Sequence, residues 1–161
     1  MRSTKIILQT AEVYTTRWMR QNGDSMLRVS IGIVFFWFGI LKFFPGVSPA
    51  QDLAIRTISL LTFGILPASV IINMLALWEV VIGIGFITGK YLKATLLLLF
   101  AQMLGTFTPV FLFPDEVFTA IPYAPTLEGQ YIIKNIVIVS AGFVIGAKVF
   151  GNSQKLKAKT L

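Results

Sequence analysis

The sequence contains no cysteine and no histidine. Without thiols, the chain itself offers no disulfide chemistry, no thiol redox chemistry and no thiolate ligands for an iron–sulfur cluster. Without imidazoles, it offers no histidine ligand for haem and no histidine general base. A phosphate-binding loop of the GxxxxGK[ST] kind is missing as well. We therefore expect no metal site, no covalently bound cofactor and no catalytic activity from the chain alone.

Charged residues are also scarce, at 13% of the chain against about 25% in soluble proteins. Hydrophobic residues make up 55%, and they gather in four runs at 26–44, 69–88, 91–113 and 131–150. Each run has about the 20 residues that a helix needs to cross a bilayer. Because backbone groups in lipid must be satisfied within the segment, the runs predict helices. The predicted fold is an all-α membrane protein with a four-transmembrane-helix bundle at 26–150.

Residues 1–25 are predicted to form an interfacial helix on the cytoplasmic leaflet. Basic side chains lie beside one apolar face, a pattern typical of helices on anionic lipid surfaces. This face is formed by Ile7, Ala11, Tyr14 and Trp18. Asn22-Gly23 is predicted to break this helix, and Asp24 or Ser25 to cap the first span.

A short helix is predicted in the first outer loop. Ser48, Pro49 and Gln51 have the spacing of a capping box with a proline at the first helical position. The helix would run through Ile65 and be stopped by Pro67. One of its faces is apolar, formed by Ala54, Ile58, Leu61 and Ile65, and another carries an Asp52–Arg56 pair at i,i+4 spacing. After the third loop, Thr126 is predicted to cap the fourth span, with Glu128 in its first turn.

The basic residues predict orientation. They gather in residues 1–28, in the second loop with Lys90, and in the tail at 151–161, whereas the loop at 114–130 has only acidic charges. This bias predicts that both termini lie in the cytoplasm. We expect the membrane to be a bacterial cytoplasmic (inner) membrane. Because the net charge of +7 is divided among separate segments, lipid headgroups are expected as its partner and nucleic acid is not.

Polar residues inside the spans are candidates for function, since they are costly in lipid. The predicted ligand-binding set is Lys42, Asn73, Glu79, Gln102, Lys134 and Asn135. Glu79 and Gln102 fall near the midplane, and the other four lie nearer the outer surface. Lys42 and Glu79 differ in depth by roughly 8–12 Å at 1.5 Å per residue. The arrangement predicts an outward-opening polar pocket, with aromatic walls at Phe35, Phe36, Phe43, Phe44 and Trp78.

A second set of residues is predicted to pack inside the bundle. Arg28, Gly32, Gly39 and Lys42 share one face of the first span with Phe35, and Gly83 shares a face with Glu79. Glycine lets a neighbouring helix approach closely. Gly142 and Gly146 have small-xxx-small spacing, which fits packing within the bundle and also fits a homodimer contact.

Each polar residue also has a purely structural interpretation. Lys42 and Lys134 can extend to headgroups, and Gln102 can form an interhelical hydrogen bond. Glu79 at the midplane needs either a proton or a cationic partner. A structural ion pair would satisfy that need as well as a ligand would, so both interpretations stay open.

The sequence resembles the DoxX-like family of small four-span membrane proteins. The likeness rests on Arg28, Gly32, Gly39 and Lys42-Phe43, on WEVVIGIGFITG in the second span and on LEGQYIIKN at 127–135. It covers roughly residues 26–150. The resemblance implies a four-helix bundle that serves as a quinone-linked accessory subunit or as an assembly helper. It also implies that Lys42, Glu79, Lys134 and Asn135 are the family's polar positions.

Two functions follow as hypotheses. One is an accessory subunit that binds a quinone or another small lipophile and serves a redox protein that carries the cofactor. The other is a non-enzymatic bundle that assembles or supports a membrane-protein partner. A proton-coupled transporter is a weaker third hypothesis, because the sequence shows no inverted repeat and no pair of broken helices.

Overall fold

The computed structural model describes residues 2–48 and 50–158, with side chains described for 9–48 and 50–151. The predicted roles of Pro49, Ile7 and the basic tail beyond residue 151 therefore lie outside the described residues. The elements in chain order are α1 (Arg2–Leu41), α2 (Gln51–Leu61), α3 (Ala68–Thr88), α4 (Leu92–Phe107), α5 (Pro109–Leu112), α6 (Pro114–Val117), β1 (Phe118–Ala120), β2 (Ala124–Pro125) and α7 (Leu127–Ala158).

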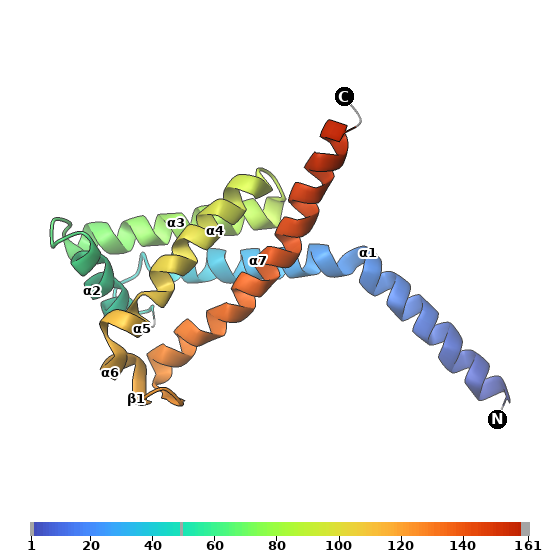
Figure 1. Ribbon diagram of the computed structural model, residues 1–161, viewed down its shortest axis with the longest axis horizontal. Coiled ribbons are helices and arrows are strands. Elements are labelled where there is room, and N and C mark those ends of the chain that lie inside the picture. The colour runs from blue at the N-terminus through green and yellow to red at the C-terminus, as the bar shows by residue number, and fades with distance from the viewer. Residues whose placement is uncertain (1, 49, 159–161) are drawn as a thin grey trace.

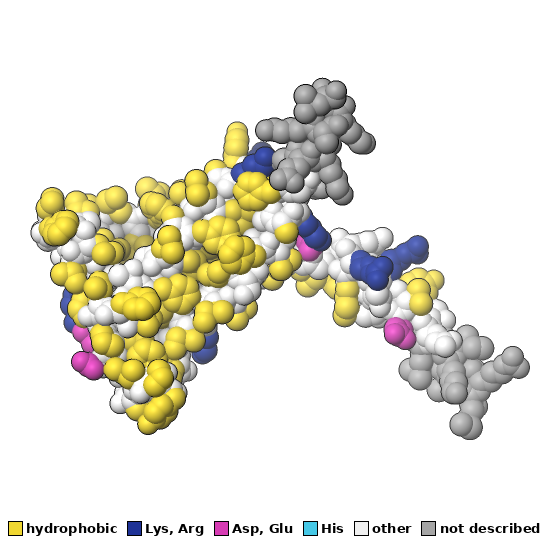
Figure 2. All heavy atoms as spheres, viewed as in Figure 1, with side chains coloured by type: hydrophobic (Ala, Val, Ile, Leu, Met, Phe, Trp, Pro, Cys, Tyr) yellow, Lys and Arg dark blue, Asp and Glu magenta, His cyan; other side chains and the backbone are white. Residues whose placement is uncertain are grey.

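Four helical stretches are long and apolar enough to cross a membrane: Gln9–Leu41, Ala68–Thr88, Leu92–Leu112 and Leu127–Gly151. The last three agree closely with the predicted runs, and the first overlaps its run but begins at residue 9 rather than 26 and ends at 41 rather than 44. This is the architecture of a multi-pass helical membrane protein. Large apolar side chains remain exposed along all four, and Figure 2 shows them covering the visible face of the bundle. Such a surface suits lipid rather than water. The prediction of an all-α chain needs one small correction, because β1 and β2 form an antiparallel hairpin.

The bundle has two distinct ends (Figure 1). The short elements α2, α5, α6 and β1 gather at one end, which we call the loop end. The two termini extend from the other end, where the turn between α3 and α4 also lies. Within the bundle, α1 packs along α3, and α4 packs against both α3 and α7. The loop-end elements are joined to the bundle by contacts of α2 with α3 and of α6 with α7.

The predicted break at Asn22-Gly23 is wrong, since α1 is continuous through both residues. The side-chain amide of Asn22 donates to the carbonyl oxygen of Trp18, one turn back in the same helix. Asp24 pairs with Lys148 of α7 instead of capping a new helix. A glycine inside a helix costs only about 1 kcal/mol relative to alanine, and contacts with α7 can offset that cost.

The helix α1 is longer than a membrane is thick. Residues 9–41 span about 50 Å as a helix, against about 30 Å of hydrocarbon. Figure 1 shows the N-terminal part of α1 projecting away from the other helices. Val13, Tyr14, Trp18 and Met19 are exposed on it. Its position on a membrane surface stays a prediction.

The predicted capping box at the start of α2 is also wrong. The helix begins at Gln51, and its cap residue is Ala50 in a left-handed conformation with no side-chain cap. The helix ends at Leu61 rather than Ile65. The amides of Phe63 and Gly64 then bond back to the carbonyls of Leu60 and Ser59, which is the pattern of a Schellman motif. Pro67 is the cap residue of α3 rather than the stop of α2.

Two apolar clusters form the interior. The larger one draws from all four long helices: Ile31, Phe35, Ile82, Phe86, Leu96, Leu99, Met103, Ala141 and Ile145. The smaller one joins Leu53 of α2, Val117 of α6 and Ile132 of α7 at the loop end. The second cluster therefore makes α2 part of the folded body rather than a free loop.

Candidate functional site

Three polar side chains, from the end of α1, from α3 and from α4, meet in the interior. The Lys42 ammonium lies 2.6 Å from Oε2 of Glu79, and the Gln102 amide nitrogen donates to Oε1 of Glu79 at 2.8 Å. The side chains of Lys42 and Glu79 are each only 11% exposed. We call Lys42, Glu79 and Gln102 the polar cluster. Each oxygen of the Glu79 carboxylate thus has a partner, which offsets part of the cost of burying it.

Gly39 explains why Lys42 reaches Glu79 in spite of the predicted difference in depth. A Cβ atom on Gly39 would lie 2.9 Å from Cβ of Glu79, so the two residues are directly opposite each other. Lys42 follows Gly39 by three residues, about one turn of helix. The depth prediction assumed that the outer ends of the two helices are level. In the structure α1 ends at Leu41, shortly after Gly39, whereas α3 begins at Ala68, about three turns before Glu79.

A cavity of about 670 Å³ lies beside the polar cluster. All four long helices line it, and α2 lines it from the loop end. The volume is within the usual range of small-molecule pockets, about 300–1,000 Å³. Its lining is mostly apolar, and it includes Phe35, Phe38, Leu53, Ile71, Trp78 and Ile132. The polar residues of the lining are Lys42, Ser48, Thr57, Glu79, Gln102, Thr106, Tyr131, Lys134 and Asn135.

The structure brings five of the six predicted ligand-binding residues to this cavity. Asn73 is the exception, because it is exposed on α3 and does not line the cavity. Lys134 and Asn135 line it from α7, and the Asn135 amide donates to the carbonyl of Tyr131 at 3.0 Å. Lys134 is exposed and has no hydrogen bond or ion pair with any residue that the structure describes.

The predicted aromatic walls are partly wrong. Phe35 and Trp78 line the cavity as expected, whereas Phe36, Phe43 and Phe44 do not. Phe43 and Phe44 follow the end of α1 and are exposed, and Phe36 faces Gly83 of α3. Phe38, which the sequence did not single out, takes a place in the lining. The Trp78 indole also donates to the carbonyl of Leu98 at 3.2 Å, which links α3 to α4.

The predicted packing residues lie at helix contacts. A Cβ atom on Gly32 would lie 2.8 Å from the backbone nitrogen of Ile87, and one on Gly83 would lie 2.5 Å from the backbone nitrogen of Phe36. Arg28 donates to the carbonyls of Phe86 and Ile87, at the carboxyl end of α3. A cation is favourable there, because it satisfies carbonyls that the helix leaves free.

Gly142 and Gly146 face α4 within the same chain. A Cβ atom on Gly142 would lie 3.1 Å from the Leu99 side chain, and one on Gly146 would lie 3.7 Å from that of Leu96. These two glycines are therefore part of the bundle interior. A homodimer, if one forms, would need a different surface.

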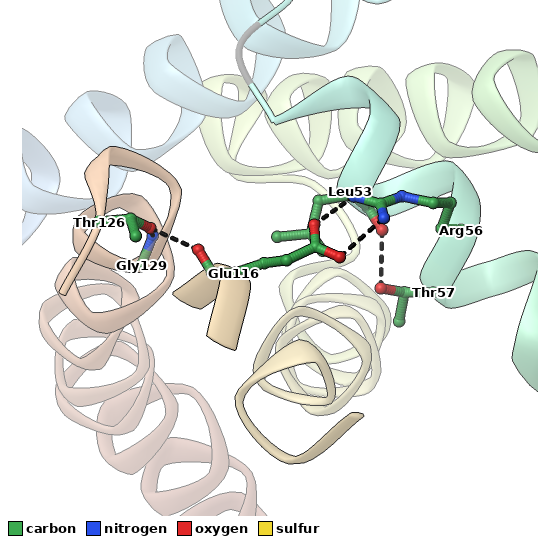
Figure 3. Close-up of polar contacts among 6 residues, drawn as sticks. All are labelled: Leu53, Arg56, Thr57, Glu116, Thr126 and Gly129. Atoms are coloured by element: carbon green, nitrogen blue, oxygen red, sulfur yellow. Dashed lines mark hydrogen bonds and ion pairs between the residues drawn. The ribbon is translucent and has the colours of Figure 1, made fainter. Parts of the chain in front are cut away.

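The loop end is closed by contacts among α2, α6 and α7 (Figure 3). Both terminal nitrogens of Arg56 bond the two carboxylate oxygens of Glu116, so the predicted partner Asp52 is replaced by a residue of α6. Arg56 also lies over the Phe113 ring at 5.5 Å. As predicted, Thr126 caps α7: its hydroxyl accepts from the amide of Gly129 at 3.1 Å and donates to the carbonyl of Glu116 at 2.7 Å.

Breaking the pair between α2 and α6 should loosen α2. We expect Arg56→Gln and Glu116→Gln to speed hydrogen exchange of the α2 amides by a few-fold, because each removes a two-point contact that joins α2 to α6. High salt should have a similar effect on the wild type, since the pair is exposed. Mass-spectrometric hydrogen exchange measures this. Asp115→Asn is the control, and equal exchange in all four proteins would contradict the prediction.

The pH dependence of this contact follows from Arg56. The hydrogen bonds that Arg56 donates to Glu116 raise the pKa of Arg56 above its ordinary value. Because the pKa of Arg56 is higher in the folded than in the unfolded protein, the ion pair contributes its full stability at any pH below the pKa of the unfolded state. This stability is lost only as the pH rises through the pKa of the folded state. Mild alkali should therefore leave the protection of α2 unchanged.

The sequence predicts that α2 lies on, or is tucked into, the outer surface of the bundle, but not that it lines the cavity. The signal was present in its predicted apolar face, because Ala54, Ile58 and Leu61 of that face all line the cavity. Two further residues of α2, Leu53 and Thr57, are buried, and Thr57 satisfies its hydroxyl by donating to the Leu53 carbonyl at 2.7 Å. A face of this kind on an extramembrane helix fits the end of a bundle as well as it fits a lipid surface.

Within the described residues, no group of three or more carboxylates comes together as a metal site would require. The polar cluster offers hydrogen-bond donors, acceptors and one ion pair. Such a cluster can recognise a polar group on a lipophilic molecule or exchange a proton.

Comparisons of the chain with known protein families, with curated proteins and with solved structures find no match.

Proposed function

We propose that the chain binds a quinone-like or other small lipophilic molecule in the cavity and serves a membrane partner that carries out redox chemistry. One observation carries the proposal: an apolar cavity of ligand size meets a buried polar cluster inside the bundle. Most lipophilic ligand sites combine an apolar lining with a few oriented polar groups.

The available polar atoms suit an oxygen-bearing head group. Lys42 uses one of its N–H groups for Glu79, and Lys134 is part of the cavity lining without a hydrogen bond to any described residue. Each ammonium has three donors, so both can bond a ligand oxygen. With two lysines and one glutamate, the lining is formally positive, which favours an electron-rich oxygen over a cation.

We further propose that the chain is of DoxX-like type and lies in a bacterial cytoplasmic membrane with both termini in the cytoplasm. Gly32, Gly39 and Lys42, which are among the residues that carry the resemblance to the family, lie together at the contact between α1 and α3. This common position supports the proposal that the chain has the architecture of the family. The basic residues Arg17, Arg20, Lys90 and Lys148 are on the terminal side of the bundle, which supports the orientation. The cavity would then lie nearer the outer side.

A second function, the assembly or support of another membrane protein, is favoured by the projecting part of α1. Tyr14 is 68% exposed there and Trp18 is 53% exposed. Aromatic residues and arginine are enriched at protein interfaces. This function needs no ligand in the cavity, which allows the two proposals to be separated by experiment.

Mass spectrometry of retained lipophiles tests the first proposal. We expect protein purified in mild detergent to retain about one equivalent of a specific lipophile beyond bulk phospholipid. Ala54→Phe, which adds a ring to the cavity lining while leaving the polar cluster intact, should abolish retention. Glu79→Gln should reduce it, because the charge that orients Lys42 and Gln102 is removed.

Asn73→Leu is the matched control, since it removes a polar group from the same helix but outside the cavity. It should retain the lipophile fully. Bulk lipid alone in every sample would contradict ligand binding and favour the assembly function. A lipophile that Ala54→Phe retains would show that it binds elsewhere.

A further inference from the structure

Gln102 carries a hydrogen-bond acceptor that no described residue satisfies. Its Oε1 atom is buried and has no partner among the described residues, although the amide nitrogen of the same side chain is bonded to Glu79. A buried acceptor left unpaired costs about 1–3 kcal/mol. Native structures rarely leave such an atom without a function or a bound molecule.

The Glu79 carboxylate fixes the direction of this amide. A carboxylate only accepts hydrogen bonds, so the Gln102 nitrogen must face it and the Gln102 oxygen must face away. Rotating the amide by half a turn would place its oxygen 2.8 Å from the Oε1 atom of Glu79, where two acceptors would repel each other. The ion pair with Lys42 holds the carboxylate in place on its other side. The cluster therefore keeps one acceptor in a defined orientation.

Gln102 itself lines the cavity, together with Thr106 one turn further along α4. The Thr106 hydroxyl already donates to the backbone carbonyl of Gln102 at 3.0 Å, so it does not satisfy the side chain. A partner for Oε1 must come from outside the described residues. Because Gln102 lines the adjoining cavity, such a partner can come from there, once the side chains that cover the buried Oε1 atom move aside.

We propose that the cavity selects lipophiles with a hydroxyl donor, such as a phenol or a quinol, over the same molecules without it. The O–H group would donate to Oε1 of Gln102, while its oxygen accepts from a lysine ammonium of the lining. A quinone carbonyl only accepts, so it would leave the Gln102 oxygen unpaired. This inference rests on the proposed function and deepens it by naming the hydrogen-bonding class of the ligand.

A matched pair of probes tests the selection. 4-Nonylphenol and its methyl ether, 4-nonylanisole, differ only in the O–H group. We expect the wild-type protein in nanodiscs to bind the phenol about tenfold more tightly, after correction for partition into lipid. Tenfold corresponds to about 1.4 kcal/mol, as expected for one hydrogen bond to a buried acceptor.

Gln102→Met should bring the ratio close to one, because methionine has similar length and no comparable acceptor. Asn73→Met makes the same chemical change on an exposed part of α3 and should keep the tenfold ratio. A ratio near one in the wild type would overturn the inference, whatever the stability of the variants. A tenfold ratio that persists in Gln102→Met would also overturn it, because the methyl group of the ether would then be rejected for its size.

The test separates this inference from the proposed function. If both probes bind equally, and Ala54→Phe abolishes both, the cavity binds lipophiles but does not select for a donor. If Ala54→Phe changes the binding of neither probe, the cavity is not the binding site, and both the proposed function and this inference fail.

Discussion

Glu79→Leu should lower the free energy of unfolding by about 3–5 kcal/mol, because it leaves the Lys42 ammonium buried without its partner. The side chain of Lys42 is only 11% exposed. Its other close contact is the Phe38 carbonyl at 3.4 Å, a long hydrogen bond that cannot replace a carboxylate. The loss can be measured by unfolding in mixed micelles, followed by circular dichroism.

The double variant Lys42→Met/Glu79→Leu should recover most of this loss. Replacing a buried ion pair by apolar side chains of similar volume is often close to neutral, whereas removing one partner is costly. The double variant should lose selective ligand retention all the same, because Gln102 then has no carboxylate to orient it. Stability and ligand binding would thus respond differently to the same pair of changes.

Two outcomes would count against this argument. If Glu79→Leu unfolds like the wild type, the Lys42 ammonium must reach the headgroups in the variant, which is the structural interpretation considered from the sequence. If the double variant is as unstable as Glu79→Leu, the loss comes from packing around residue 79 rather than from an unpaired charge.

The four spans and the inward position of Glu79 could be predicted from the sequence, because both follow from the cost of polar groups in lipid. Hydrophobic runs of about 20 residues predict helices, and a carboxylate at the midplane predicts a polar partner. Gln102 was placed at the level of Glu79 by counting residues along two antiparallel helices. The hydrogen bond between them agrees with that count.

The partners that depend on loops could not be predicted in the same way. Arg56 had a plausible partner four residues away in Asp52, but it pairs with Glu116, 60 residues away. Local spacing gives no information on which distant segment brings Glu116 to Arg56. Asn73 was grouped with Lys42 by depth alone, and depth does not determine which face of a helix turns toward a cavity.

The continuity of α1 illustrates a different limit. Asn22-Gly23 is a strong turn signal in isolation, yet α1 continues through it and pairs with α7 through Asp24 and Lys148. Tertiary contacts can override a local preference of about 1 kcal/mol. A pattern in one segment cannot report a contact made 124 residues later.

The contact between α1 and α3 should be the most sensitive to added volume. We expect Gly83→Ala to lower the free energy of unfolding by about 1–3 kcal/mol, because the new methyl group would lie 2.5 Å from the backbone nitrogen and 2.7 Å from Cα of Phe36. Backbone atoms cannot turn aside as a flexible side chain can. The two helices must therefore separate along their shared face.

Gly23→Ala is the matched control, because it makes the same change within α1 at a position with nothing within 4 Å. Alanine favours a helix over glycine by about 1 kcal/mol, so this variant should be as stable as the wild type or slightly more stable. Separation of α1 from α3 would also move Lys42 away from Glu79, because the close contact between Gly39 and Glu79 places Lys42, one turn further on, within reach of the carboxylate. Gly83→Ala should therefore lose ligand retention as well as stability. If Gly83→Ala gained stability as Gly23→Ala does, the close approach of the two helices would be contradicted, and with it the geometry that unites the polar cluster.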